Sequence, residues 1–149
     1  YGALTGLNKV EMSQKIGENK VYQFRRSWEM KPDPLSKESP YHPSKIKTYK
    51  DIPIEKIPDT ESLKDTYKRV IEFYDEEIKN RLKNKNILIS AHGNSIRALC
   101  KYLFKLDNSQ ISKLEIPTGN PLLIEVNENY KIQNCEYLDK ERAKNLIVF

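Results

Sequence analysis

One short stretch restricts the folds open to this chain more than any other. The segment Ile87-Leu88-Ile89-Ser90-Ala91 has the apolar and small residues of a buried strand, and it runs directly into His92-Gly93-Asn94-Ser95, where a helical pattern begins. A strand that ends in a sharp turn at the start of a helix is a basic unit of α/β folds. Ligands of open α/β sheets bind beyond the carboxyl ends of the strands. The stretch therefore predicts an α/β fold with a site at His92.

The chemistry of that turn favours an anion. Helix N-termini offer unpaired N–H groups and a partial positive charge, so they suit phosphate or carboxylate. His92 is one of only two histidines, and it precedes Gly93, a residue type that lets a ligand approach the backbone closely. We therefore favour a functional role for His92 over a structural one. Ser95 is expected to cap the helix, and His42, in the segment Tyr41-His42-Pro43, is expected to lie on the ordinary surface.

Length and composition exclude several classes of protein. A chain of 149 residues, 38% hydrophobic and 32% charged, has the length of one domain. It contains no apolar run of membrane-spanning length and no basic-then-apolar leader, so we expect a soluble, cytoplasmic protein without a membrane partner. The net charge of +5 comes from scattered residues, without the clustered stripe or aromatic platform that nucleic-acid binding requires. Cys100 and Cys135 lack metal-site spacing, and Cys100 is expected to be a small core residue in a reduced protein.

Periodicity predicts the order of the secondary structure. Helices are expected at 7–17, 18–29, 60–83 (with Ser62 and Asp65 as a capping box), 95–105, about 107–114 and 139–147. Between the second and third helices, residues 30–58 hold six of the eight prolines and predict a long irregular excursion. Strands are expected at 86–91, 121–126 and 130–138, the last two as a hairpin.

This order favours a mostly parallel sheet with an antiparallel edge. Only three strands are visible, however, and the segment Ile87–Ile89 has the composition of a strand buried on both faces. Such a strand needs a neighbour on each side, and the hairpin covers one side at most. We therefore expect the sheet of the 149-residue chain to be incomplete.

Five blocks of sequence carry a resemblance to a known family. The chain is similar to the 2,3-bisphosphoglycerate-dependent phosphoglycerate mutases, which belong to the histidine phosphatase superfamily. The match extends over nearly the whole chain, in register, and is weakest from about 30 to 58 and in the last dozen residues. The matching blocks are Tyr1–Lys9, Phe24–Ser27, Thr60–Thr66, Ala91–Leu99 and Ile116–Gly119.

The resemblance implies a three-layer α/β/α fold and an isomerase of glycolysis and gluconeogenesis. Members of the family interconvert 3-phosphoglycerate and 2-phosphoglycerate without a metal. A histidine in an Arg-His-Gly segment near the N-terminus carries the phosphoryl group, and 2,3-bisphosphoglycerate is both primer and intermediate. Many members are homodimers or homotetramers, so the resemblance implies a homo-oligomer.

The resemblance also assigns roles to residues of this chain. His92 corresponds to the second active-site histidine, which stabilises the transferring phosphoryl group. The positions that correspond to substrate-binding residues are Tyr1, Lys9, Arg25, Arg26, Gly93 and Asn94. Elementary chemistry agrees, because guanidinium and ammonium groups neutralise phosphate and carboxylate, and His92 would meet the charge that develops during transfer.

Two parts of the family pattern have no counterpart in this sequence. Neither histidine stands in an Arg-His-Gly segment, and the acidic proton donor that precedes the Tyr-Gly-Ala block in the family is absent. We therefore expect residues 1–149 to be the C-terminal part of a single mutase domain, without its N-terminal strands. Two alternatives stay open: a bisphosphoglycerate synthase or phosphatase on the same scaffold, and a non-catalytic anion-binding module. Asn120 stands where a small apolar residue is commoner, and the sequence gives no functional interpretation of it.

The missing histidine leads to a first prediction. A polypeptide that begins at Tyr1 should not turn over 3-phosphoglycerate by itself, because it holds one of the two histidines that the chemistry needs. A coupled assay on purified chain, with its N-terminus verified by intact mass, measures this. Turnover above the level of a heat-denatured control would contradict the prediction.

Overall fold

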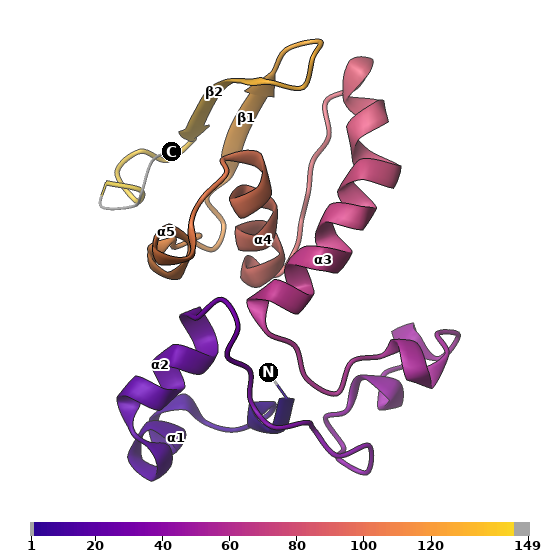
Figure 1. Cartoon of the computed structure of the whole chain (residues 1–149), viewed down its shortest axis with the longest axis vertical. Helices are drawn as coiled ribbons and strands as arrows, with labels where there is room; N and C mark the ends of the chain where they lie inside the picture. The colour runs from indigo at the N-terminus through magenta and orange to yellow at the C-terminus, as the bar shows by residue number, and fades with distance from the viewer. Residues whose placement is uncertain (1, 145–149) are drawn as a thin grey trace. The chain divides into compact units, whose positions relative to one another are not determined.

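The computed structural model describes residues 2–144 of the chain. The chain forms two compact units, Tyr1–Asp65 and Thr66–Phe149 (Figure 1). Helices predominate, and the described strands are two neighbours near the C-terminal end of the sequence. Within residues 2–144, no helix is both long enough and apolar enough to cross a bilayer.

Two helices open the first unit after a short 3-10 turn, η1 (Gly2–Leu4). The Asn8 side chain caps α1 (Lys9–Ile16) by accepting a hydrogen bond from the Val10 N–H at 2.8 Å. Gly17 ends α1 at a φ of 86°, and α2 (Glu18–Arg26) begins with the next residue. Both predicted helices are confirmed, although α2 ends at Arg26 because Ser27 is extended.

The excursion after α2 is irregular, as predicted, and contains three 3-10 turns: η2 (Pro43–Lys45), η3 (Lys47–Tyr49) and η4 (Ile54–Lys56). The surface position expected for His42 is wrong, because its ring is fully buried. Its Nε2 lies 2.9 Å from Asp59 Oδ1, and its Nδ1 accepts the Ser44 N–H at 3.2 Å. A polar ring is buried without large cost when both nitrogens are hydrogen-bonded. His42 therefore joins two points of the excursion that are 17 residues apart in sequence.

The predicted helix over 60–83 is confirmed, and it consists of three consecutive helical segments of different types. It begins as α3 (Leu63–Phe73), continues through a π-helical turn, η5 (Tyr74–Ile78), and ends as a 3-10 helix, η6 (Lys79–Lys83). The predicted capping box is present, since the Asp65 N–H donates to Ser62 Oγ and the Ser62 N–H donates to Asp65 Oδ2, both at 3.1 Å. The Ser62 N–H and the Ser62 hydroxyl both donate to the Asp65 carboxylate, and these two bonds hold the pKa of the carboxyl below its ordinary value.

The predicted strand over 86–91 is not formed among the described residues. These residues are extended, but they pair with no strand among residues 2–144, and Leu88 is 90% exposed. A strand needs a partner for its ladder hydrogen bonds, and the hairpin instead pairs with itself. In that hairpin β1 (Leu122–Val126) runs antiparallel to β2 (Ile132–Tyr137), as predicted. The register runs from Leu122 opposite Tyr137 to Val126 opposite Ile132.

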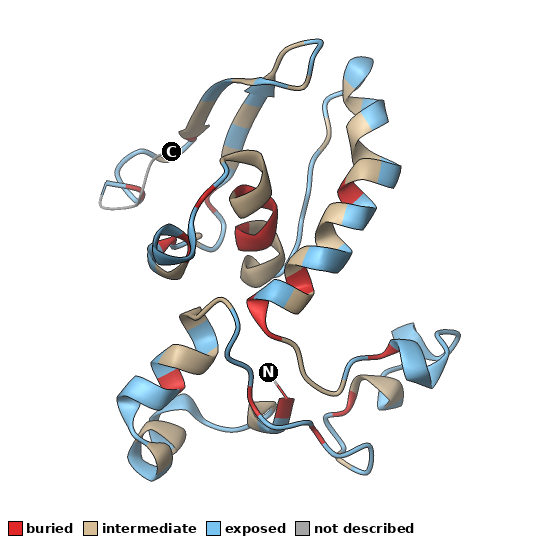
Figure 2. Ribbon diagram, in the orientation of Figure 1, coloured by how far each residue is buried: buried red, intermediate tan, exposed pale blue. Residues whose placement is uncertain are grey.

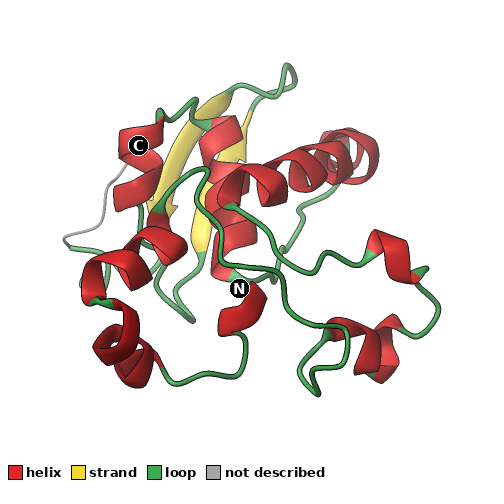
Figure 3. Cartoon of the chain, turned by 60° about the horizontal axis from the view of Figure 1, so that its bottom comes forward, coloured by secondary structure: helices red, strands yellow, loops and turns green. Residues whose placement is uncertain are grey.

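Two further helices pack near this hairpin in the second unit. α4 (Gly93–Leu103) begins two residues before the predicted start, and α5 (Asn108–Lys113) carries a capping box between Asp107 and Gln110. Figures 1 and 3 both show α4 beside the two strands. Residues 139–144 form turns in place of the predicted final helix, and the rest of that prediction lies outside the described residues.

Each unit buries its own apolar residues (Figure 2). Apolar burial drives the packing of both units. The first unit buries Val21, Leu35, Ile57 and Leu63. The second buries Tyr74, Ala98, Leu99, Cys100, Leu106, Ile111, Leu114, Tyr137 and Ala143, which confirms the core position predicted for Cys100.

The His42 contacts lead to a second prediction. His42→Ala should destabilise the excursion by about 1–3 kcal/mol, because Asp59 and Ser44 lose their partner. Hydrogen exchange of residues 39–60 measures the effect. Lys45→Ala, an exposed neighbour in the same turn, is the matched control and should leave exchange unchanged. Equal protection in the His42 and Lys45 variants would show that the ring does not hold the excursion.

Candidate functional site

The candidate site begins at the first turn of α4, where His92 is the N-cap. Its backbone is extended, with φ −61° and ψ 143°, and its ring Nδ1 accepts the Asn94 N–H at 3.3 Å. The backbone carbonyl of His92 accepts the N–H groups of Ser95 and Ile96 at 2.9 and 3.2 Å. The predicted cap at Ser95 is therefore wrong, because the imidazole of His92 performs that role.

This capping bond sets the tautomer of the neutral ring. Because Nδ1 accepts a hydrogen bond, the proton of the neutral imidazole lies on Nε2. Nε2–H is then a donor on an exposed side chain at the positive end of a helix dipole. The geometry suits donation to an anionic oxygen.

Asn94 and Gly93 follow His92 in the same turn. Asn94 Oδ1 accepts a hydrogen bond from Arg97 Nη1 at 3.0 Å. A Cβ added at Gly93 would meet no atom of the described residues within 4 Å, so the space over this position is open. The structure thus brings together three predicted site residues: His92, Gly93 and Asn94.

The basic residues of the first unit lie at helix ends. Arg25 and Arg26 are the last two residues of α2, where a cation also interacts favourably with the helix dipole. Lys9 is the first residue of α1, where a cation opposes the dipole, so helix stability does not explain it. Tyr1 lies outside the described residues. Gly2, next to it, lies against the excursion, because a Cβ added there would clash with the Asp33 carbonyl oxygen.

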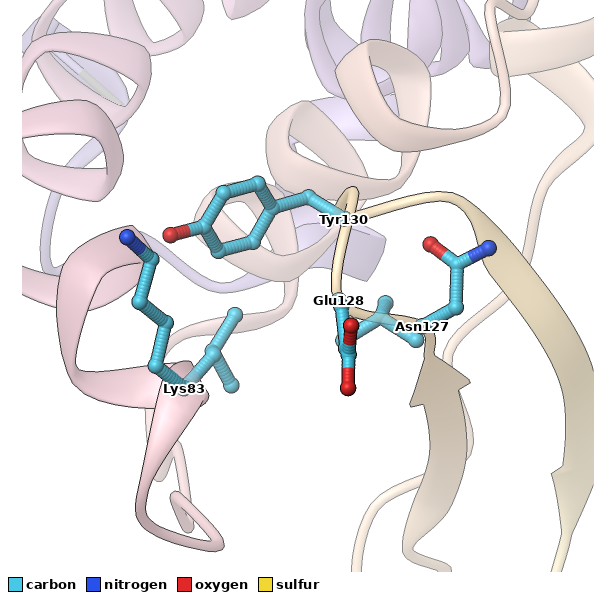
Figure 4. Close-up of a pocket in the computed structure, with 6 residues that line it drawn as sticks. Lys83, Asn127, Glu128 and Tyr130 are labelled. Carbon is cyan, nitrogen blue, oxygen red and sulfur yellow. The ribbon is translucent and has the colours of Figure 1, made fainter.

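Two pockets of the described residues are lined by side chains other than Lys9, Arg25, Arg26 and His92. One, of about 410 Å³, lies in the second unit, and a smaller one of about 160 Å³ lies in the first unit beside Gly2, Asp59 and Thr60. Figure 4 shows the larger pocket, with the amino end of Lys83 beside the hydroxyl end of Tyr130. Its lining residues are Leu82, Lys83, Val126, Asn127, Glu128 and Tyr130.

Burial disfavours the thiolate form of both cysteines. Burial raises the pKa of the Cys100 thiol to about 12, and it raises the pKa of Cys135 as well. The thiolate is the reactive form of cysteine, so neither side chain is a candidate nucleophile. Within residues 2–144, no three His, Cys, Asp or Glu side chains are grouped to hold a metal ion.

Two residues with clear roles were missed or left without a role by the sequence analysis. Arg97 is 2% exposed on the inward face of α4. The sequence held a signal for this, because Arg97 stands among Ile96, Leu99 and Cys100, the apolar residues of the helix. Asn120, also buried, donates from Nδ2 to the Asp139 carbonyl at 2.9 Å and accepts the Asp139 N–H at 3.0 Å. Its role is to hold the base of the hairpin.

Comparison with known proteins identifies the class. The chain matches the profile of the histidine phosphatase superfamily (branch 1) over residues 26–134. It belongs to this superfamily, as the resemblance predicted.

The chain is also similar to individual proteins that share one name. The chain is 67% identical over 150 residues to a 2,3-bisphosphoglycerate-dependent phosphoglycerate mutase of Pelagibacter ubique (strain HTCC1062), an alignment that covers 100% of this chain and 63% of the relative. It is 47% identical over 147 residues to a protein of the same name from Hyphomonas neptunium, covering 98% of this chain and 61% of the relative. A third protein of that name, from Zymomonas mobilis, is 45% identical over 141 residues, covering 94% and 60%. The chain therefore spans less than two thirds of the length of these relatives.

The burial of the thiols gives a third prediction. At pH 8, an aromatic disulfide reagent should label Cys135 faster than Cys100, because Cys100 is the more deeply buried and its pKa of about 12 leaves almost no thiolate. The appearance of the released thiol, followed with Cys135→Ser and Cys100→Ser variants, separates the two rates. In denaturant both should react at the same rate. Faster labelling of Cys100 in the folded protein would contradict the burial.

Proposed function

We propose that the protein to which this chain belongs is a 2,3-bisphosphoglycerate-dependent phosphoglycerate mutase. It interconverts 3-phosphoglycerate and 2-phosphoglycerate, a step of glycolysis and gluconeogenesis. The observation that carries the proposal is the first turn of α4, at the helix N-terminus. There His92 Nδ1 and Asn94 Oδ1 both accept hydrogen bonds, so the other polar end of each side chain is a donor suited to an anion. The names of relatives up to 67% identical support the same activity.

The roles of the residues follow from their chemistry. The Nε2–H of His92 donates to the phosphoryl oxygens as charge develops on them during transfer. Arg25 and Arg26 bind phosphate or carboxylate through their planar guanidinium groups, and Lys9 adds a point charge. Gly93 and Asn94 hold the substrate, and Tyr1 contributes to the same binding. The histidine that carries the phosphoryl group has no counterpart among residues 1–149.

The donor set fits 2,3-bisphosphoglycerate, a ligand with two phosphates and a carboxylate. Guanidinium and ammonium groups and a helix N-terminus are each chemically suited to phosphate or carboxylate. When bound, this molecule supplies the phosphoryl group that keeps the enzyme phosphorylated. We propose no metal for the reaction, in keeping with the resemblance.

The remaining sequence-based expectations are part of the same proposal. The extended segment 86–91, with Leu88 exposed, has the composition of a central strand, and we propose that it joins a mostly parallel sheet in a single mutase domain. A homo-oligomer remains the expectation from the resemblance, and a cytoplasmic location remains the expectation from composition.

The site gives a fourth prediction, for the whole protein encoded by the gene. His92→Ala should lower kcat by about 10²–10³-fold, because it removes one preorganised donor to the transferring group. Arg25→Ala and Arg26→Ala should mainly raise KM for 3-phosphoglycerate, because they remove ground-state binding. Steady-state kinetics in both directions measures these changes.

A matched control for the arginine variants is available on α1, the helix that precedes α2. Lys15→Ala removes an exposed cation from the last turn of α1 and should leave both constants unchanged. A His92→Ala enzyme with the wild-type kcat would overturn the role of His92. If the wild-type protein turned over only 2,3-bisphosphoglycerate, it would be a phosphatase on the same scaffold.

A further inference from the structure

Arg97 is an exception among the buried residues of the second unit. Its side chain is 2% exposed, and it projects from α4 next to Ala98 and Leu99. Burying a guanidinium is costly unless its donors are hydrogen-bonded, so a buried arginine requires an explanation in its contacts.

The contacts of Arg97 run in two directions. Its Nη1 donates to Asn94 Oδ1 at 3.0 Å, one turn earlier in the helix. Its Nη2 donates to the backbone carbonyl of Ile111 in α5. Ile111 is fully buried, and α5 is fixed at its start by the Asp107–Gln110 capping box. Arg97 therefore ties the Asn94 side chain to a buried part of the second unit.

This tie decides which end of the Asn94 amide faces a ligand. A guanidinium has donors and no acceptor, so the atom that it contacts must be the amide oxygen. The NH2 end is then left to donate, and a pure donor suits phosphate or carboxylate oxygen. The backbone N–H of Asn94 is already committed to His92 Nδ1. The backbone N–H and the side-chain amide of Asn94 are thus both oriented before a ligand binds.

We propose that Arg97 is a positioning residue, which acts through Asn94 and presents its NH2 group to an anionic oxygen of the substrate. Arg97 does not touch the substrate itself. The identity of the substrate as a phosphoglycerate rests on the proposed function, whereas the orientation of the amide rests on the contacts alone.

Lys101 provides a matched control on the same helix. It too is a basic residue of α4, and it donates to the Leu106 carbonyl at 2.6 Å and to Asn108 Oδ1 at 3.1 Å. It therefore also joins α4 to the start of α5. Its hydrogen bonds do not involve Asn94, so Lys101→Met reports the loss of a structural tie without the loss of positioning.

The fifth prediction is a double-variant cycle in the whole protein. Arg97→Met should lower kcat/KM for 3-phosphoglycerate on the order of 10²-fold, since a misplaced group costs about that much. In an Asn94→Ala background the same change should cost no more than about threefold, because residues that act through one another are not additive. Lys101→Met should lower Tm and leave kcat/KM unchanged. Multiplicative losses from Arg97→Met and Asn94→Ala would overturn the proposal.

Two additions keep the test decisive. If Arg97→Met does not fold, Arg97→Lys takes its place, because it keeps the charge but lacks the planar fork whose two terminal nitrogens reach Asn94 and Ile111. The side-chain NH2 resonances of Asn94, assigned by their loss in Asn94→Ala, should shift in the Arg97 variant and stay in place in Lys101→Met. Unchanged NH2 resonances would overturn the positioning role. If the wild-type protein did not turn over 3-phosphoglycerate, the proposed function would fail, and these resonances would still decide the role of Arg97.

Discussion

The first turn of α4 sets the constraint on which the candidate site depends. A helix leaves its first N–H groups without intrahelical partners, and each must be satisfied by a side chain, water or a ligand. Here an imidazole nitrogen accepts the N–H of Asn94. The same side chain therefore caps the start of α4 and carries the expected chemistry. A serine cap would satisfy the same N–H group but would leave no ring nitrogen to donate. The capping of the helix N-terminus and the chemistry of the site therefore depend on one side chain.

Most of the helical structure followed from local sequence, because its determinants are local. Asn8, Ser62 with Asp65, and Asp107 with Gln110 cap their helices through bonds that span at most three residues. The segment 86–91 could not be predicted in the same way. Its composition is that of a strand, but a strand is defined by its partner, and no partner lies among residues 2–144. A sequence pattern can show that a segment prefers an extended conformation, but it cannot show that a second strand is present to pair with it.

The site was predictable in part for the same reason. His92, Gly93 and Asn94 are consecutive, so the turn that holds them was visible in the sequence. The role of Arg97 depends on a carbonyl 14 residues away, and the burial of His42 depends on Asp59, 17 residues away. Resemblance assigned residues to binding, but it did not say which side chains hold them in place. Composition and periodicity predict buried polar residues poorly, because the hydrogen-bond partners of such a residue decide whether its burial is tolerated.

The Asn120 contact has a consequence for how the hairpin can change over time. Its amide makes with the Asp139 peptide the two hydrogen bonds that a facing residue of a strand would make, just beyond the last paired residues Leu122 and Tyr137. One rung of the ladder is therefore encoded by a side chain. A backbone rung survives almost any substitution, whereas this one can be gained or lost by a single codon change. The effective length of the hairpin is thus open to evolutionary adjustment without insertion or deletion.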